Sequence, residues 1–283
     1  MASTTVGVLH PGNMGVSVAA SAKNSGCRVL WASDGRSQET RQRAEAQDLV
    51  DVGTLAALCE ASDLVIGICP PHAAEQVAAD VAATGYQGLY LDANAISPMR
   101  TQAIAESMAG AGIALVDGGI VGGPAWQPGT TLYLAGQSAE RVASCFSAGP
   151  LATAVLGDEI GQAAALKMCY AAWTKGTTAL LCAILAVSEA NGVWEPLAEL
   201  WDVRHDGMDA QAVARARSVT AKAWRFAGEM QEIAATFEQA GMPGGFHSAA
   251  SELYEKLAEF KGAPELPTIE DVLAALRDAQ APL

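Results

Sequence analysis

Lys167 is the residue whose type and position most directly suggest chemistry. It is the only charged residue between Glu159 and Lys175, in an otherwise apolar stretch of helical composition. Burial there would lower the pKa of its amine toward neutrality, and such an amine can take a proton from a hydroxyl group or return it. Helical periodicity places Tyr170 and Thr174 on the same face, so both are candidate catalytic partners. In the alternative interpretation, the lysine extends along the helix to solvent and the tyrosine belongs to the core.

A second candidate site is the segment VGVLHPGNMG, residues 6–15, which leads from an apolar run into a helical stretch. Gly12 would let the backbone approach a pyrophosphate at the helix N-terminus, and Gly15 would let the helix pack closely on the strand. A histidine replaces the first glycine of the usual G-x-G-x-x-G pattern, and the proline after it restrains the turn. We predict a dinucleotide site here, with a turn that binds no ligand as the alternative. The loop residues predicted to contact the cofactor are His10, Pro11, Gly12, Asn13 and Met14.

The end of the second expected strand bears on the choice between NAD and NADP. An NAD site usually presents a carboxylate at this strand tip, where it binds the ribose hydroxyl groups. Here Ser33 is followed by Asp34, Arg36 and Ser37. A guanidinium with two hydroxyl groups suits a 2′-phosphate, whereas Asp34 favours the unphosphorylated ribose. We predict NADP, with NAD as the less favoured cofactor, and assign Ser33, Arg36 and Ser37 to its binding.

The elements that must position these residues follow from an alternation of short apolar runs with helical stretches. The runs that predict strands are TVGVL, RVLWA, DLVIGI, GLYLDA, ALVDG and TLYLAG. Between most of them lie segments of helical period, such as residues 14–25 and 72–83. This order is typical of βαβ units, so we predict an α/β Rossmann domain, a doubly wound, mainly parallel sheet, over residues 1–158.

The second half of the chain predicts helices only. Residues 159–192 contain no proline and suit one long helix that connects two domains. Further helical stretches cover residues 197–201, 210–240 and 248–260, and TIEDVLAALRDA predicts a short last helix. We therefore predict an all-α domain over residues 159–283.

Composition excludes several classes of protein. Over 283 residues, 51% are hydrophobic, 17% are charged, and the formal net charge is −14. This balance is typical of a globular enzyme, and the negative charge argues against binding to nucleic acid. The start MASTTVGVLH lacks the pattern of a signal peptide and no long uninterrupted apolar run follows, so we expect a soluble cytoplasmic protein. Six widely spaced cysteines without a histidine cluster predict neither a metal site nor a disulfide framework.

Several motifs occur in the order found in the β-hydroxyacid dehydrogenase superfamily, which includes 6-phosphogluconate dehydrogenase and the related imine reductases. The segments that carry the resemblance are VGVLHPGNMG, CPPH, LDANAISP, VDGGIVGGP, TTLYLAG and GQAAALKMCYA, and in the second half WRFAGEMQEIA and GMPGGFHSAASELY. The second half resembles a less-characterised branch of the superfamily. The resemblance implies that Lys167 is the catalytic lysine and that the helical half forms an intertwined homodimer.

The resemblance also assigns roles to residues in the other motifs. Next to the cofactor it places Cys69, Pro70, Pro71, Asn94 and Ser97. The predicted substrate-binding residues of the glycine-rich motif are Asp117, Gly118, Gly119, Gly122 and Gly123, whose backbone N–H groups could bind a carboxylate. A glycine-rich turn that binds no ligand is the alternative for that motif.

The chain departs from the family pattern at three places. Ala171 stands where the dehydrogenases have an asparagine, and Val121 replaces a common serine. A lysine that family members carry near EMQEI is absent, so Glu229 or His247 is expected to face the substrate instead. These departures suggest a substrate unlike the usual small hydroxyacids.

The prediction that combines these features is an NADP-dependent oxidoreductase. It would transfer hydride between the nicotinamide and a hydroxyl or carbonyl carbon of a small carboxylate-bearing substrate, with Lys167 as general acid and base. Two alternatives remain: an imine reductase that reduces C=N on the same scaffold, and a non-catalytic protein that senses NADP(H).

Overall fold

The computed structural model describes residues 3–277, and the chain divides into two compact units, Met1–Met168 and Cys169–Leu283. The last strand of the first unit, β8 (Leu151–Gly157), ends where the sequence predicted the first domain to end. The helix that follows, α7 (Gln162–Ala171), belongs to the first unit through Met168. The first unit therefore contains Lys167 together with the whole sheet.

An eight-stranded sheet forms the centre of the first unit, in the order β3-β2-β1-β4-β5-β6-β7-β8. Its other strands are β1 (Thr5–Val8), β2 (Arg28–Trp31), β3 (Val50–Asp51), β4 (Leu64–Gly67), β5 (Leu89–Asp92), β6 (Ala114–Val121) and β7 (Thr130–Ala135). Only β6 and β7 are antiparallel among the paired strands. The predicted doubly wound, mainly parallel sheet is confirmed, with β3 and β8 as strands that the sequence did not reveal.

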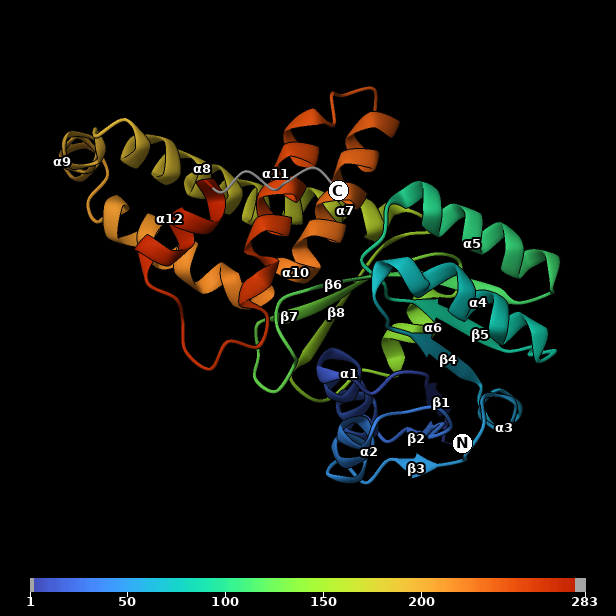
Figure 1. Ribbon diagram of the computed structural model, residues 1–283. Coiled ribbons are helices and arrows are strands. Elements are labelled where there is room, and N and C mark those ends of the chain that lie inside the picture. Colours follow the sequence, from blue (N-terminus) through green and yellow to red (C-terminus); the bar gives the residue numbers. More distant parts are fainter. Residues whose placement is uncertain (1–2, 278–283) are drawn as a thin grey trace. The chain divides into compact units, whose positions relative to one another are not determined.

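Helices cover both faces of this sheet because successive side chains of each strand alternate between them. The helices of this unit besides α7 are α1 (Asn13–Asn24), α2 (Gln38–Glu45), α3 (Leu55–Ala61), α4 (Ala74–Ala83), α5 (Pro98–Gly110) and α6 (Ala139–Ser144). Leu91 packs in one core cluster with Val18 of α1, whereas Tyr90 packs in the other with Val81 of α4. Figure 1 shows α4 and α5 side by side on the second face, and residues of the two helices contact each other. Parallel strands end together, so the loops after β1, β4 and β5 lie along one edge of the sheet.

The second unit contains only helices over its described residues. These are α8 (Thr177–Ala190), α9 (Trp194–Arg204), α10 (Met208–Gln239), α11 (Gly245–Lys256), a short 3₁₀ helix (Leu257–Phe260) and α12 (Ile269–Arg277). The long helix α10 packs against α8, α11 and α12. The predicted all-helical second half is confirmed, while the last two residues of TIEDVLAALRDA lie outside the described residues.

The helical stretch predicted over residues 159–192 differs from the expectation in two ways. It begins at Gln162 and ends at Ala190, and a π-helical segment (Ala172–Gly176) separates α7 from α8. An 18-residue window within Gln162–Ala190 is apolar enough to pass for a membrane span, with a mean hydropathy of 1.3, but half of that window is buried inside the protein. A core helix of a soluble protein has the same properties, so the stretch is weak evidence for a membrane.

Candidate active site

The loop between β1 and α1 has an open backbone position at Gly12 and a closed one at Gly15. Gly12 is the N-cap of α1, and among the described residues no atom lies within 4 Å of the position that a Cβ would occupy there. At Gly15 a Cβ would collide with the carbonyl oxygen of His10. Gly15 is thus needed for close packing of helix on strand, whereas the space beside Gly12 can admit a phosphate group at a helix N-terminus.

The remaining residues of this loop are placed around the same turn. Asn13 is exposed as the first residue of α1, and Met14 is partly buried against the core. The carbonyl oxygen of Pro11 accepts a hydrogen bond of 3.3 Å from Nε of Arg43 in α2, which links the loop to the neighbouring helix. Burial, and then the charge of Arg36, lower the pKa of His10 to about 4. His10 is therefore neutral at pH 7, and its Nδ1 is buried without a hydrogen-bond partner in residues 3–277.

The tip of β2 brings together the residues predicted for a 2′-phosphate. Ser37 caps α2 and accepts a hydrogen bond from the Thr40 backbone N–H at 3.3 Å. Arg36 is partly buried, and its Nε has no partner in the described chain. Sequence reasoning missed Arg41, whose guanidinium donates to the carbonyl oxygen of Ser33 at 2.7 Å. Two guanidinium groups therefore lie near this strand tip, because Arg41 is one turn into the helix that Ser37 begins.

A carboxylate near this tip is already engaged by the backbone. Oδ1 of Asp51, at the end of β3, accepts hydrogen bonds from the N–H groups of Ser33 at 3.2 Å and Gly53 at 2.8 Å. Asp51 stabilises the turn through these bonds, so one of its oxygens is occupied by the protein itself.

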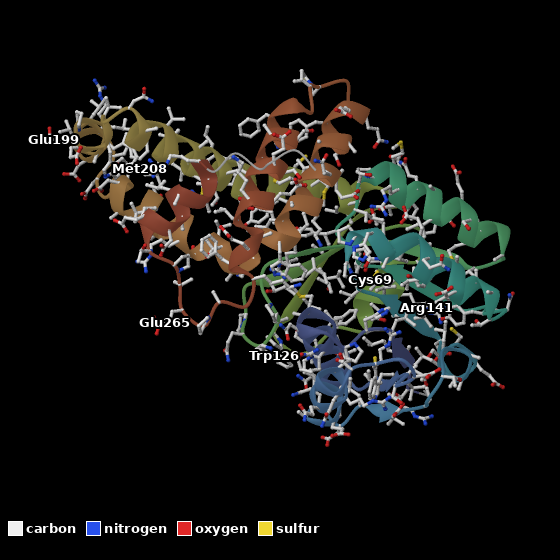
Figure 2. The ribbon with its side chains drawn as sticks, in the orientation of Figure 1. Cys69, Trp126, Arg141, Glu199, Met208 and Glu265 are labelled. Atoms are coloured by element: carbon white, nitrogen blue, oxygen red, sulfur yellow. The ribbon has the colours of Figure 1, made fainter. Side chains whose placement is uncertain are left out.

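The loop after β4 and the end of β5 form a connected network. The side-chain oxygen of Asn94 accepts a hydrogen bond of 2.7 Å from the backbone N–H of Cys69, which fixes the orientation of the amide. The Asn94 Nδ2 group is buried, at a residue only 3% exposed, and makes no hydrogen bond of good geometry within residues 3–277, although the Asn94 side chain lies close enough to Asp92 to lower the pKa of that carboxyl. A buried amide donor without a partner is costly unless a ligand accepts its hydrogen bond. Figure 2 labels Cys69 in this loop, beside the first turns of α4.

Other predicted residues of these loops serve the local fold. Pro70 and Pro71 begin a short 3₁₀ helix (Pro71–Ala73), and the carbonyl oxygen of Pro71 accepts a hydrogen bond from Arg100 at 2.8 Å. Burial, followed by the charge of Asp92, raises the pKa of the Cys69 thiol to about 12, so Cys69 is not a reactive thiolate at neutral pH. Ser97 is the buried N-cap of α5.

Asp117 anchors the helix that carries Lys167. Its Oδ2 atom accepts hydrogen bonds from the backbone N–H groups of Gly161, Ala163 and Ala164 at 2.9, 2.9 and 3.2 Å. A carboxylate at a helix N-terminus stabilises the helix, and these bonds fill the side of Asp117 that faces α7. Asp117 was predicted to bind substrate; the structure places its carboxylate where it holds α7 against β6.

Gly118 and Gly119 lie inside β6, where they allow close packing. A Cβ at Gly118 would lie 2.8 Å from Leu91 Cδ1. A Cβ at Gly119 would collide with the carbonyl oxygen of Ala163 and lie 3.3 Å from the Cβ of Lys167. The glycine at position 119 therefore determines how closely Lys167 approaches the sheet.

Gly122 and Gly123 follow β6 in the loop that carries Trp126, which is labelled in Figure 2. Gly122 has a φ of 127°, a conformation that favours glycine, and a Cβ there would also meet Thr130. At Gly123 no described atom other than its chain neighbours lies within 4 Å of a Cβ position, while its carbonyl oxygen accepts a hydrogen bond of 2.8 Å from Thr130 Oγ1. The space beside the Gly123 Cα is therefore open to a ligand.

Two predicted catalytic partners begin the second unit. Tyr170 is 51% exposed, in the last turn of α7. Thr174 lies in the π-helical segment, and its hydroxyl group donates to the Tyr170 carbonyl oxygen at 3.2 Å. The π segment changes the angular position of residues after Ala171 relative to a regular α-helix, on which the prediction for Thr174 was based. Short π-helical segments inside α-helices are frequent at functional sites.

Glu229 and His247 occupy a polar and aromatic cluster inside the second unit. Glu229 forms an ion pair of 2.8 Å with Lys175, and both side chains are mostly buried. His247 is 5% exposed and packs edge-on against Phe237, with ring centroids 4.3 Å apart. Burial lowers the pKa of His247. Within its own unit, Glu229 therefore has a structural partner that the sequence did not indicate.

Asp92 is the main site residue that the sequence analysis passed over. It ends β5 with a side chain only 2% exposed, and its Oδ1 accepts a hydrogen bond of 3.0 Å from the Asn94 backbone N–H. Its position in LDANAISP, directly after a buried apolar run, was the available signal. A carboxylate at the carboxyl end of a buried parallel strand lies at the edge where ligands bind.

The family of the chain follows from its first unit. A family model described as the NAD binding domain of 6-phosphogluconate dehydrogenase matches residues 5–153. The chain belongs to this NAD-binding family. Residues 189–257 match a domain of unknown function (DUF1932), a range that contains α9, α10 and α11. No curated protein matches the chain.

Solved structures with the same fold include dehydrogenases and reductases. A conserved hypothetical protein from Sinorhizobium meliloti is 23% identical, with a TM-score of 0.72 over 97% of this chain and 96% of that one. The 3-hydroxyisobutyrate dehydrogenase of Mycobacterium tuberculosis is 17% identical, with a TM-score of 0.73 over 98% and 100%. An imine reductase from Myxococcus stipitatus, in complex with NADP⁺, is 18% identical, with a TM-score of 0.57 over 96% and 99%. At these identities the similarity shows a shared fold.

Proposed function

We propose that this protein is an NADP-dependent oxidoreductase that interconverts a hydroxyl and a carbonyl group on a small carboxylate-bearing substrate. The observation that carries the proposal is the arrangement within the first unit. The open backbone position at Gly12 and the buried amide of Asn94 lie in loops after β1 and β5, at the carboxyl edge of the sheet. The Cβ of Lys167 lies 3.3 Å from the Cβ position of Gly119, near the carboxyl end of β6. A dinucleotide bound along this edge would bring its reactive ring into the region of Lys167.

In this proposal each residue has a defined task. The N-terminus of α1 binds the pyrophosphate beside Gly12, and the Asn94 Nδ2 group donates a hydrogen bond to the nicotinamide end of the cofactor. The nicotinamide supplies or accepts hydride when it is bound. Lys167 takes the proton of a substrate hydroxyl group during oxidation and returns it during reduction. The Gly123 backbone, open to a ligand, contributes to binding of the substrate carboxylate.

NADP is favoured over NAD by the guanidinium groups near the tip of β2. Arg36, whose buried Nε has no partner in the described chain, and Arg41, which donates to the Ser33 carbonyl oxygen, would form charge-assisted hydrogen bonds with a 2′-phosphate, together with the hydroxyl groups of Ser33 and Ser37. The matched test compares kcat/KM for NADP and NAD in the wild type and in Arg36→Gln. We expect the variant to lose at least tenfold with NADP and little with NAD. A wild-type preference for NAD would refute the assignment.

Imine reduction is the second candidate, and the buried Ala171 is the observation in its favour. Ala171 is 2% exposed and replaces the asparagine that the hydroxyacid dehydrogenases use beside the lysine. A site without that amide offers one fewer hydrogen bond to a substrate alcohol. An amine and imine panel therefore accompanies the hydroxyacid panel in the experiment below.

The proposed protein is a soluble, cytoplasmic homodimer that binds neither nucleic acid nor membrane. Three large apolar side chains in residues 173–187 are exposed. Their exposed fractions are 70% for Trp173, 46% for Leu180 and 62% for Val187. Exposed apolar side chains that recur at this spacing on one helix are typical of an interface. Light scattering measures the mass directly, and we expect Leu180→Asp with Val187→Asp to shift a dimer to a monomer. A monomeric wild type would contradict the proposal.

The experiment that tests the activity is a substrate panel followed by the absorbance of the reduced nicotinamide. The panel contains 3-hydroxy acids, 2-hydroxy acids, the matching oxo acids, and cyclic amines and imines, each with NADP and NAD in both directions. Turnover of a hydroxy or oxo acid supports the proposal, and turnover of imines alone favours the second candidate. Tight NADPH binding without any turnover indicates the non-catalytic sensor.

A further inference from the structure

Two buried carboxyl groups are neighbours beside the helix of Lys167. Asp92 in β5 and Asp117 in β6 are register partners on adjacent parallel strands. Register partners direct their side chains to the same face of a sheet, and these two are 2% and 1% exposed. Two carboxylates this close in a buried site disfavour each other's ionised form.

The two carboxyl groups differ in how well the protein supports a negative charge. Asp117 accepts three backbone N–H groups at the N-terminus of α7, at 2.9 to 3.2 Å. Asp92 accepts one backbone N–H group, from Asn94, and the Asn94 side chain also lowers the pKa of this carboxyl. Burial raises the pKa of Asp92 to about 7 and that of Asp117 to about 6. Asp92 is therefore the member of the pair that is protonated more easily.

Lys167 faces the same side of the sheet as this pair. Its Cβ lies next to the Cβ position of Gly119, two residues after Asp117 on β6, and residues two apart on a strand share a face. The charge of Lys167 lowers the pKa of both Asp92 and Asp117, opposing the effect of burial. The ammonium group and both carboxyl groups thus form one electrostatic cluster.

Other titratable groups near Asp92 stay uncharged at neutral pH. Burial raises the pKa of Tyr90, on the same face of β5, well above its usual value, and raises that of Cys69, after β4, to about 12. Tyr90 and Cys69 therefore do not exchange protons with Asp92 and Asp117 near pH 7.

We propose that Asp92 is a positioning residue for Lys167, whose carboxyl group decides how readily the amine gives up its proton. One proton is shared between two sites: it lies on the Lys167 amine while Asp92 is a carboxylate, or on Asp92 while the amine is neutral. Both arrangements have the same net charge with Asp117 ionised. The amine can thus become neutral for proton abstraction without leaving a second uncompensated carboxylate in the buried site. The inference rests on the proposed function, because it gives Lys167 a protonation state suited to that reaction.

The test is Asp92→Asn in the full-length protein, read by competitive acetylation of lysines with acetic anhydride. The amide oxygen of asparagine can still accept the hydrogen bond from the Asn94 N–H, while the negative charge is lost. The extent of modification of Lys167, quantified on its peptide by mass spectrometry from pH 5 to 11, measures the fraction of neutral amine. We expect the midpoint to move about one pH unit lower in the variant, because an opposite charge nearby stabilises the ammonium form.

The matched control is Glu106→Gln, which removes an exposed carboxylate of α5 in the same unit. We expect no change in the Lys167 midpoint in this variant. The wild type itself gives a second measurement: coupled groups titrate in two steps, so its labelling curve should show an additional inflection near the pKa of Asp92, about 7.

An unchanged midpoint in a folded Asp92→Asn, or a shift to higher pH, would overturn the inference. If that variant does not fold, a wild-type curve with one step would overturn it equally. Labelling needs no turnover, so a shifted midpoint without activity on any substrate counts against the proposed function alone. With an active substrate, the acid limb of kcat/KM for alcohol oxidation should move in the same direction.

Discussion

Replacing Gly12 by alanine separates the stability of the protein from its affinity for the cofactor. The backbone at Gly12 has φ −71° and ψ −173°, which alanine adopts without strain, and no described atom lies within 4 Å of the new methyl group. Alanine is a poorer N-cap than glycine but also restricts the unfolded chain, and these effects oppose each other. We expect the free energy of unfolding to change by less than about 1 kcal/mol.

The methyl group of Gly12→Ala would occupy the space that the pyrophosphate needs. We expect the Kd for NADPH, measured by titration calorimetry, to rise at least tenfold, which corresponds to about 1.4 kcal/mol. Two controls bracket this result. Gly110→Ala, another position without neighbours at the end of α5, should change neither quantity, whereas Gly15→Ala should cost about 1–3 kcal/mol because it collides with the backbone. Wild-type affinity in a folded Gly12→Ala would refute the assignment of this loop.

Three further predictions concern packing, pH and an ion pair. Gly119→Ala should push α7 away from β6, because the new methyl group would collide with the Ala163 carbonyl oxygen. We expect kcat/KM to fall on the order of 100-fold with unchanged affinity for NADPH. Unchanged turnover would contradict the role of Gly119 in positioning Lys167. Because burial lowers the pKa of His10 to about 4, its contribution to stability is present above pH 6.5 and is lost as the pH falls toward 4. Urea unfolding should show that His10→Gln removes up to about 3 kcal/mol of this acid sensitivity, and an identical pH dependence would count against it. Glu229→Gln leaves the mostly buried Lys175 without its ion-pair partner, so the free energy of unfolding in urea should fall by about 1–3 kcal/mol. Adding Lys175→Met should recover part of this loss. An unchanged free energy of unfolding would show that the pair contributes nothing to stability.

The sheet was predictable because its signals are local. The six predicted strands are short buried runs bounded by turn residues, and the loop predicted to bind phosphate directly follows the first of them. β3 has only two residues and β8 is mostly partly exposed, so neither contains a distinctive apolar run. The π-helical segment Ala172–Gly176 was not predicted, although it contains Gly176, the only glycine within residues 162–190.

Residues whose roles depend on strand pairing were the ones that the sequence placed least well. Asp92 becomes significant only when β5 and β6 lie next to each other and bring it beside Asp117. Asp117 was predicted to bind substrate, but the sequence could not show that α7 returns to the sheet and covers its carboxylate with three N–H groups. The partner of Glu229 likewise depends on the packing of α10 in the second unit.

The most direct test of the central claim is the turnover of Lys167→Met with the best substrate from the panel, alongside its Kd for NADPH. Methionine keeps most of the length of the side chain but cannot carry a proton. We expect kcat to fall by at least about 100-fold, or about 2.7 kcal/mol, with unchanged cofactor affinity and fold. Near wild-type turnover in this variant would contradict the role of the lysine and, with it, the proposed mechanism.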